Sequence, residues 1–205
     1  MKRADFDAPY YRRFYASEKT RVNGTREVAR LGAVLVGLVL FYGGRLRSVL
    51  EIGAGTGQLR DWFRVNRPSV RYLSTEYSSH ACATYGHEKR DISRWRAKRT
   101  FDLVLCQGVL PYLPDADASR AIENLYAMTG GFLYLEAVTQ RDYRSACDRS
   151  RTDDQMIFRP AAFYRSRLRH KFIALGGGLY YRADGPLQFY ELETLVGTSK
   201  RSFRS

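Results

Sequence analysis

The segment from Val49 to Leu59, VLEIGAGTGQL, constrains the fold of this chain more than any other. Four residues typical of a buried strand lead into three glycines at alternate positions, Gly53, Gly55 and Gly57. Glycine permits a positive φ and lets a ligand approach the backbone closely. A helix that follows such a turn offers free N–H groups at its N-terminus. The order of strand, glycine-rich turn and helix therefore predicts a nucleotide-binding site.

The spacing of the glycines separates two classes of ligand. A dinucleotide site needs Gly-x-Gly-x-x-Gly, in which the third glycine lets the helix pack closely on the strand. In this chain Gln58 stands at that third position, and the third glycine comes one place earlier, at Gly57. A nicotinamide-dependent oxidoreductase is therefore the least favoured interpretation.

The rest of the chain alternates short β-rich runs with helical stretches, which predicts an α/β fold around a mostly parallel sheet. Seven strands are expected, at Ser48–Ile52, Val70–Thr75, Gly86–Arg90, Phe101–Cys106, Gly131–Glu136, Lys171–Leu175 and Leu187–Glu191. Helices are expected on both faces, at Thr25–Tyr42, Gly57–Val65, Asp115–Met128 and Arg159–Arg169. The turn signal Asp184-Gly185-Pro186 separates the last two strands, so we expect them to form an antiparallel hairpin.

The glycine segment resembles the first motif of the class I S-adenosylmethionine-dependent methyltransferases. That motif reads apolar-apolar-Glu/Asp-apolar-Gly-x-Gly-x-Gly, and the run from Glu51 to Gly57 fits it throughout. The resemblance implies an enzyme with a Rossmann-like fold, S-adenosylmethionine as cofactor and S-adenosylhomocysteine as product. The cofactor residues that it implies in this segment are Glu51, Gly53, Ala54, Gly55 and Gly57.

Two acidic residues further along the chain extend the resemblance. Glu76, followed by Tyr77, ends the second expected strand, where the family places a carboxylate on the ribose hydroxyls; a carboxylate can accept two such hydrogen bonds. Asp91 and Ile92 follow the third expected strand, where the family contacts adenine. Alternative interpretations stay open for both acids: Glu76 as a solvated loop residue, and Asp91 as the N-cap of a short helix.

The fourth and fifth expected strands end in further matches to the family. Gln107 and Gly108 follow the fourth strand and would lie beside the methionine half of the cofactor. The resemblance then implies a wall near the reacting methyl group, made of Leu110, Pro111 and Tyr112. Glu136 ends the fifth strand on the side expected for the substrate. The resemblance is of the small-molecule type and covers roughly residues 45 to 195.

The N-terminal run YYRRFY, from Tyr10 to Tyr15, is rich in aromatic residues. In the family a helix ahead of the first strand often covers the cofactor, and an aromatic face attracts a sulfonium cation by roughly 0.5–2 kcal/mol. We therefore expect an N-terminal helical lid, with Tyr11 and Tyr15 as substrate candidates and Arg21 near the cofactor carboxylate. The open alternative is that these rings simply pack on the sheet.

The absence of several motifs limits the classes of molecule that are expected to accept the methyl group. The chain lacks the Asn/Asp/Ser-Pro-Pro-Tyr/Phe motif of amide and base-amino methyltransferases, and it lacks the Pro-Cys dipeptide of cytosine-C5 enzymes. We therefore expect transfer to an O or N atom of a small molecule. Glu136 and three residues of the segment that follows it are candidates for binding a polar or cationic acceptor: Tyr143, Asp148 and Asp153. The open alternative for that segment is a plain charged helix face.

No catalytic base is assigned from the sequence. Methyl transfer is an in-line displacement whose main requirement is alignment of the reacting groups, and a base is needed only if the acceptor proton must leave early. The three histidines lack the spacing of a triad or a metal site, and each is expected to be structural or exposed: His80, His87 and His170. No metal site is predicted.

The net charge of +13 raises the possibility of a nucleic-acid partner. The basic residues are scattered, whereas a nucleic-acid-binding protein usually concentrates them on one face. An RNA methyltransferase with the same fold is therefore the first alternative, and a non-catalytic protein that binds S-adenosylmethionine is the second. The sequence does not set the oligomeric state.

The length of the chain predicts one domain, and we expect a bacterial, cytoplasmic protein. The 205 residues divide into an N-terminal helical cap (1–44), a Rossmann-like core (45–195) and a basic tail (196–205). The longest apolar run, Leu31–Tyr42, is shorter than the roughly 20 residues that span a bilayer, so we expect a packed helix and no membrane partner. Cys82, Cys106 and Cys147 are odd in number and widely spaced, which is typical of a reducing compartment.

Overall fold

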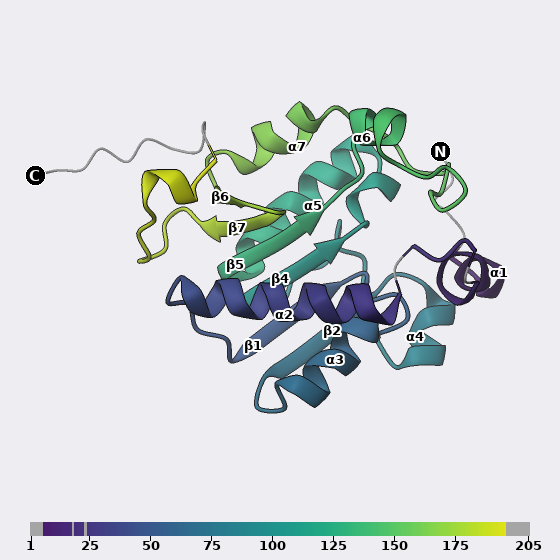
Figure 1. Ribbon diagram of the computed structural model, residues 1–205, viewed down its shortest axis with the longest axis horizontal. Helices are drawn as coiled ribbons and strands as arrows, with labels where there is room; N and C mark the ends of the chain where they lie inside the picture. The colour runs from purple at the N-terminus through teal and green to yellow at the C-terminus, as the bar shows by residue number, and fades with distance from the viewer. Residues whose placement is uncertain (1–5, 18, 23, 196–205) are drawn as a thin grey trace, which may run out of the picture.

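The computed structural model describes residues 6–17, 19–22 and 24–195 (Figure 1); the predicted basic tail lies outside these residues. A seven-stranded sheet has the order β3-β2-β1-β4-β5-β7-β6. Its strands are β1 Ser48–Ile52, β2 Arg71–Glu76, β3 Glu88–Lys89, β4 Phe101–Gln107, β5 Thr129–Glu136, β6 Phe172–Gly176 and β7 Leu179–Arg182. All strands run parallel except β7, which is antiparallel to both β5 and β6. The predicted fold class is therefore confirmed.

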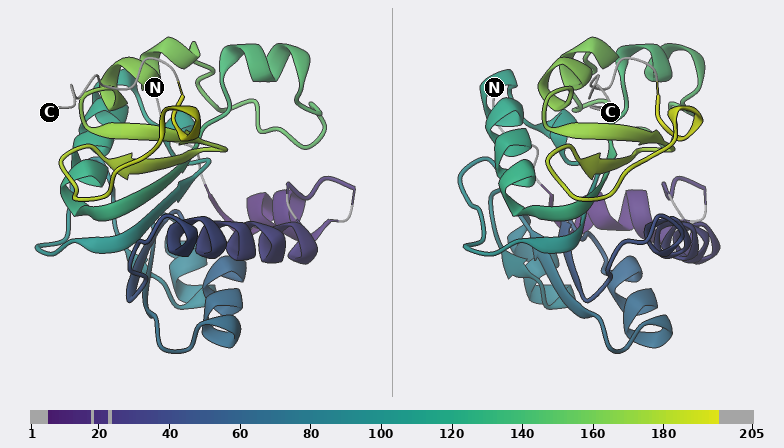
Figure 2. Two further views of the ribbon diagram at one scale, coloured as in Figure 1. Left: turned by 60° about the vertical axis from the view of Figure 1, so that its left-hand side comes forward. Right: turned by 90° about the vertical axis from the view of Figure 1, so that its left-hand side faces the viewer.

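Helices cover both faces of the sheet (Figure 2). The α-helices are α1 Ala8–Tyr11, α2 Thr25–Phe41, α3 Gln58–Asn66, α4 Ser79–Tyr85, α5 Asp115–Met128, α6 Gln140–Ser145 and α7 Ala161–Leu168. Shorter turns are η1 Arg12–Ala16, a π-helix, and the 3-10 helices η2 Leu110–Tyr112 and η3 Glu191–Glu193. One apolar core lies between the sheet and α5 and α7, and a second lies between the sheet and α2 and α3.

Helix α2 packs on the sheet as its apolar spacing predicts. Leu35, Val36 and Val39 are buried against β1 and β4 side chains in one core cluster, whereas Val34 and Leu40 on the other side are half exposed. At Gly32 an added Cβ would lie 2.5 Å from the Trp62 ring, so glycine lets α2 approach α3 closely. Within the described ranges, no helix is long and apolar enough to cross a membrane.

The C-terminal hairpin forms at a different place from the one predicted. Strands β6 and β7 are joined at Gly176, Gly177 and Gly178, whose φ angles of +90°, +55° and +80° suit a tight turn that only glycine adopts easily. The predicted strand Leu187–Glu191 was wrong, because that segment is a loop ending in η3. Pro186 has no N–H with which to pair to a neighbouring strand, and the chain instead returns to pack Phe189 on Tyr42 and Tyr181.

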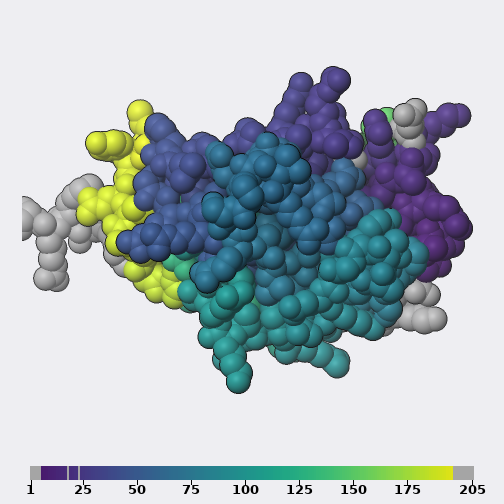
Figure 3. Space-filling view, turned by 90° about the horizontal axis from the view of Figure 1, so that it is seen from below, coloured from purple at the N-terminus to yellow at the C-terminus, as the bar shows by residue number. Residues whose placement is uncertain are grey.

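The carboxyl ends of β1, β2, β4 and β5 meet at one edge of the sheet, and two segments cover that edge. The N-terminal segment, with α1 and η1, lies beside α4 at this end of the molecule (Figures 1 and 3). The stretch from α6 to residue 157 lies above the N-terminal segment (Figure 2). This arrangement indicates that the ligand-binding site lies at the carboxyl edge, because ligands of open α/β sheets bind outside the carboxyl ends of the strands.

Candidate functional site

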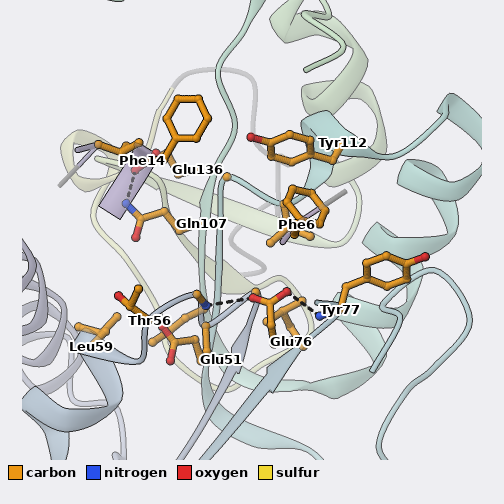
Figure 4. A pocket seen from close by; sticks show the side chains of 18 of the residues that line it. Phe6, Phe14, Glu51, Thr56, Leu59, Glu76, Tyr77, Gln107, Tyr112 and Glu136 are labelled. Atoms are coloured by element: carbon orange, nitrogen blue, oxygen red, sulfur yellow. Dashed lines mark hydrogen bonds between the residues drawn. The ribbon is translucent and has the colours of Figure 1, made fainter. Parts of the chain in front are cut away.

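A pocket lies at the carboxyl edge of the sheet, enclosed by the N-terminal segment and the loop after α6 (Figure 4). Most residues predicted for the site line it: Glu51, Gly53, Ala54, Gly55, Glu76, Tyr77, Asp91, Ile92, Gln107, Gly108 and Tyr112 from the predicted cofactor set, and Tyr11, Tyr15, Glu136 and Asp153 from the predicted substrate set. The topology therefore brings residues from seven separate segments to one cavity.

Glu76 joins the end of β2 to the glycine loop. Its Oε2 accepts a hydrogen bond from the Gly55 N–H at 3.0 Å, and its Oε1 accepts from the N–H groups of Tyr77 at 2.6 Å and Ser78 at 3.0 Å. The side chain is buried, yet it lines the pocket. Because a carboxylate has about four acceptor positions, Glu76 can accept a further hydrogen bond from a ligand while it holds the loop.

The three glycines of the loop adopt a backbone conformation that other residues rarely take. Gly53, Gly55 and Gly57 have φ angles of +75°, +57° and +77°, the left-handed region that favours glycine. An added Cβ at Gly53 would lie 2.3 Å from a Val109 methyl carbon, and at Gly55 it would lie 3.3 Å from the Tyr15 hydroxyl. At Gly53 and Gly55 the backbone alone therefore lines the pocket.

His87 holds the glycine loop in place through a hydrogen bond. The sequence predicted only that this histidine is structural or exposed. Its Nε2 lies 3.1 Å from the Gly55 carbonyl oxygen and its Nδ1 lies 2.9 Å from Ser74 Oγ. Burial, with the Arg60 guanidinium beside it, lowers the pKa of His87. The neutral ring then donates from Nε2 to Gly55 and accepts at Nδ1 from Ser74, which fixes the tautomer.

Glu51 is a buried carboxyl group at the end of β1. Its Oε2 accepts a hydrogen bond from the Tyr72 hydroxyl at 2.8 Å. Burial raises the pKa of Glu51 to about 8, against smaller lowering effects from Tyr72 and Arg60. The group is therefore mostly protonated at neutral pH.

The Glu51→Gln variant tests this protonation. A carboxyl whose folded pKa lies above its unfolded value stabilises the fold below the unfolded pKa, near 4.5, and that stability is lost as the pH rises through about 8. Each pKa unit is worth about 1.4 kcal/mol, so we expect wild type to lose a few kcal/mol of unfolding free energy between pH 5 and pH 9. Urea titrations should show most of this loss abolished in Glu51→Gln; an equal loss in both proteins would contradict the assignment.

The side of the pocket predicted to receive adenine is formed by Tyr77, Asp91 and Ile92. Asp91 Oδ1 accepts hydrogen bonds from the Ser93 N–H at 3.0 Å and the Ser93 hydroxyl at 2.8 Å. Asp91 thus caps the turn that follows it, which was the alternative interpretation, and it also lines the pocket. Ile92 is 5% exposed and presents an apolar surface beside it.

The ends of β4 and β5 contribute a hydrogen-bonded group on another side of the pocket. Gln107 Nε2 donates to Glu136 Oε2 at 3.0 Å, and the Tyr134 hydroxyl donates to the same oxygen at 3.0 Å. The two residues are register partners on adjacent strands. Figure 4 shows this group on the opposite side of the pocket from Glu51 and Glu76.

The N-terminal aromatic residues form the cover of the pocket. Tyr11 and Tyr15 have ring centroids 5.3 Å apart, and the Tyr15 ring lies over Gly55. Tyr10 packs on Phe14 at 5.0 Å, and all of these rings line the cavity. Arg21, by contrast, is exposed and lies beside Gly24, outside the residues that line the pocket.

A chain of hydrogen bonds links this cover to the loop after α6. The Tyr112 hydroxyl donates to Asp153 Oδ2 at 2.9 Å, and the hydroxyls of Tyr10 and Tyr112 lie 3.0 Å apart. Because the only hydroxyl proton of Tyr112 goes to the carboxylate, Tyr10 must be the donor to Tyr112. Burial raises the pKa of Tyr10 to about 12, so this donor keeps its proton at neutral pH.

The pocket fits S-adenosylmethionine in its shape and chemistry. The backbone of Gly53 and Gly55 lines the pocket, Glu76 retains acceptor capacity beside it, and aromatic rings suited to a sulfonium cation form the cover. Carboxyl groups exceed guanidinium groups among the lining residues, which favours a cation.

Comparison with known proteins agrees with this fit. Residues 50–130 match the family model described as a methyltransferase domain. This part of the chain is therefore similar in sequence to a methyltransferase domain. The match supports the prediction of a class I methyltransferase. No curated protein matches the sequence.

Several solved structures share the fold of this chain at low sequence identity. Magnesium protoporphyrin IX methyltransferase (ChlM) from Synechocystis PCC 6803 with bound SAH is 18% identical, with a TM-score of 0.53, over 86% of this chain and 93% of that chain. The plantazolicin methyltransferase BpumL with SAH is 13% identical, with a TM-score of 0.60, over 78% and 69%. Streptomyces venezuelae DesVI is 17% identical, with a TM-score of 0.51, over 69% and 60%. The chain spans only 58% of the S-adenosylmethionine-dependent methyltransferase from Clostridium acetobutylicum ATCC 824.

Apart from Arg21, the predicted site residues that lie outside the pocket lining are Gly57, Leu110, Pro111, Tyr143 and Asp148. Gly57 is the N-cap of α3, and Leu110 is fully buried in the core beside α5, because η2 turns its side chain inward. Tyr143 stacks on Phe158 at 3.8 Å, and Asp148 accepts hydrogen bonds from Ser150. Tyr143 lies on helix α6, in agreement with the alternative of a charged helix face, whereas Asp148 lies in the turn that follows the helix.

Other residues that line the pocket were not among the predicted site residues. They are Phe6, Tyr10, Phe14, Thr56, Gln58, Tyr134, Val138 and Met156, among others. The aromatic run pointed to Tyr10 and Phe14 as part of a cover. Nothing in the local sequence marks Met156 or Val138, whose positions depend on how the loop after α6 folds back.

Proposed function

We propose that this protein is an S-adenosylmethionine-dependent methyltransferase that transfers a methyl group to an O or N atom of a small-molecule acceptor. The observation that supports it best is the junction of Glu76 with the glycine loop: a buried carboxylate, with acceptor capacity left, beside a wall of backbone inside a covered pocket. This combination suits a ligand with a ribose diol and an amino-acid end.

In this proposal, the residues of the chain bind the cofactor and the acceptor and orient them for methyl transfer. When bound, S-adenosylmethionine supplies a methyl group activated by a sulfonium centre. Glu76 accepts from the ribose hydroxyls, Asp91 and Ile92 face the adenine, and the glycine loop with Gln107 and Gly108 holds the methionine half. Tyr11 and Tyr15 cover the cofactor and exclude water, and the acceptor enters beside Tyr112, Glu136 and Asp153. Alignment of the acceptor with the methyl group is the main contribution to rate.

A small molecule suits the pocket better than RNA does. The cover and the loop after α6 enclose the cavity, and its lining includes the carboxyl groups of Glu76, Asp91, Glu136 and Asp153. Such groups repel a phosphate backbone, whose binding depends on Lys and Arg. We also propose a bacterial, cytoplasmic location, which the three free cysteines support, because unpaired thiols are usual in a reducing compartment.

Calorimetry and label transfer test this function. We expect S-adenosylhomocysteine to bind wild-type protein at one site, and methyl-labelled S-adenosylmethionine to label a bacterial metabolite extract rather than total RNA. Absence of S-adenosylhomocysteine binding would overturn the proposal. Label in RNA that falls steeply with salt would favour the RNA alternative, and tight binding without transfer to either pool would favour a non-catalytic protein.

A further inference from the structure

Asp153 is a buried carboxylate that faces the pocket without a cationic partner. It is 4% exposed and lines the cavity. Its hydrogen bonds come from neutral donors, the Tyr112 hydroxyl at 2.9 Å and the Gln155 N–H at 3.0 Å. Among the residues that the structure describes, no Lys, Arg or His nitrogen lies within 4.0 Å of its oxygens. Buried charges are usually paired, so this carboxylate is suited to a cation that arrives with a ligand.

Aromatic rings surround the same end of the pocket. Phe6 lies edge-on to Tyr10 at 5.0 Å and to Tyr112 at 4.9 Å between ring centroids. Tyr112 is the residue that donates to Asp153. Aromatic faces attract ammonium groups, most strongly where water is excluded. A carboxylate with rings beside it is therefore suited to an organic ammonium rather than to a bare metal ion.

The charge of the pocket is opposite to that of the protein. The whole chain carries a net charge of +13. Among the described lining residues, five have carboxyl groups and one, Arg90, has a guanidinium. Arg90 is paired with Glu88 at 2.9 Å. Even with Glu51 protonated, an anionic acceptor would be repelled, and a neutral alcohol would gain little from this charge.

Asp153 lies away from the residues assigned to the cofactor ribose. Figure 4 shows its partner Tyr112 on the opposite side of the pocket from Glu51 and Glu76. The hydrogen-bonded chain of Tyr10, Tyr112 and Asp153 joins the cover to the loop after α6. Asp153 is thus placed to bind the acceptor.

We infer that the acceptor is an organic amine, bound as its ammonium ion, and that Asp153 is the residue that selects it. This inference rests on the proposed function and narrows its acceptor to nitrogen. Before transfer, the bound ammonium releases one proton to solvent water. The amine nitrogen then forms a C–N bond with its lone pair, while the C–S bond breaks and its electron pair goes to sulfur. The product regains the charge as a methylated ammonium.

Binding to wild-type protein saturated with S-adenosylhomocysteine tests the charge preference. The probes are phenethylamine, 2-phenylethanol and 3-phenylpropionate, which share a phenyl group and differ in the charge of the polar end. Calorimetry should show phenethylamine binding at least ~10-fold more tightly than the other two. Equal or tighter binding of the alcohol or the carboxylate would overturn the inference, as would no binding of the amine. Failure of S-adenosylhomocysteine itself to bind would instead overturn the proposed function.

The Asp153→Asn variant assigns the preference to one residue, with Asp148→Asn as its matched control. Asparagine keeps the shape and can still accept from Tyr112, so we expect the ~10-fold preference for phenethylamine to disappear while binding of 2-phenylethanol is unchanged. Asp148 is exposed on the same loop and outside the pocket lining, so its variant should behave as wild type. The ratio of S-adenosylmethionine to S-adenosylhomocysteine affinity should also be unchanged. If Asp153→Asn altered that ratio instead, the carboxylate would serve the sulfonium, and the inference would fail.

Discussion

The Glu76→Ala variant should bind S-adenosylhomocysteine about 2–3 kcal/mol more weakly than wild type, from the loss of charge-assisted hydrogen bonds to the ligand. This corresponds to roughly a 30- to 140-fold rise in Kd. The structure adds a second cause, because Glu76 also accepts from the backbone N–H groups of Gly55, Tyr77 and Ser78. Removal of the carboxylate therefore loosens the glycine loop as well. Calorimetry measures the affinity, and circular dichroism should show that the sheet remains.

Two further variants distinguish the effect of losing the Glu76 carboxylate from nonspecific effects of mutation. Glu76→Gln keeps one acceptor oxygen and the size of the side chain, so its affinity should lie between those of wild type and Glu76→Ala. Glu123→Ala removes an exposed carboxylate that pairs with Lys171 at 3.0 Å, outside the pocket lining, and should leave the affinity unchanged. Wild-type affinity in Glu76→Ala would refute the assignment of Glu76 to the cofactor.

The central part of the fold could be predicted because its signals are local. The run from Ser48 through Gly57 contains a strand, a turn that requires glycine and the start of a helix, and each follows from neighbouring residues alone. Glu76 could be placed for a similar reason: the carboxyl ends of parallel strands share one edge, so an acid at the end of β2 must approach the loop after β1.

The hairpin shows how a correct type of element can be placed wrongly. Asp184-Gly185-Pro186 is a turn, as its residues indicate, but it follows β7 instead of preceding it. The run Gly176–Gly178 was a competing signal, since three successive glycines can all take a positive φ. The choice between them depends on Tyr180 and Tyr181 pairing with β5, a contact between segments far apart in the sequence.

The acceptor side of the site was harder to predict, because it is built from an irregular loop. Asp148 and Asp153 lie on the same charged segment and look equivalent in the sequence. In the structure, Asp148 is exposed and accepts from Ser150, while Asp153 is buried against Tyr112. The difference comes from how the loop folds back over the sheet, which side-chain periodicity does not encode. His87 was missed for the same reason, since its contact with Gly55 joins two separate loops.

The Gly55→Val variant should lose S-adenosylhomocysteine binding altogether. Gly55 has a φ of +57°, which costs a β-branched residue roughly 1–2 kcal/mol or more. Its Cβ would lie 3.3 Å from the Tyr15 hydroxyl, and the valine methyl groups would extend further into the space between the loop and the cover. The side chain would therefore occupy the wall along which the ligand must lie. We expect no detectable heat of binding in calorimetry and a modestly lower Tm.

Gly86→Val provides a matched control for the backbone strain. Gly86 ends α4 with a φ of +73°, and nothing lies within 4 Å of an added Cβ there. Its variant should lose a similar amount of stability and still bind S-adenosylhomocysteine as wild type does. The comparison isolates the steric effect at the loop, because both substitutions impose the same left-handed conformation on valine. Wild-type binding in Gly55→Val would mean that the ligand does not lie against this glycine, and the assignment of the loop would then be wrong.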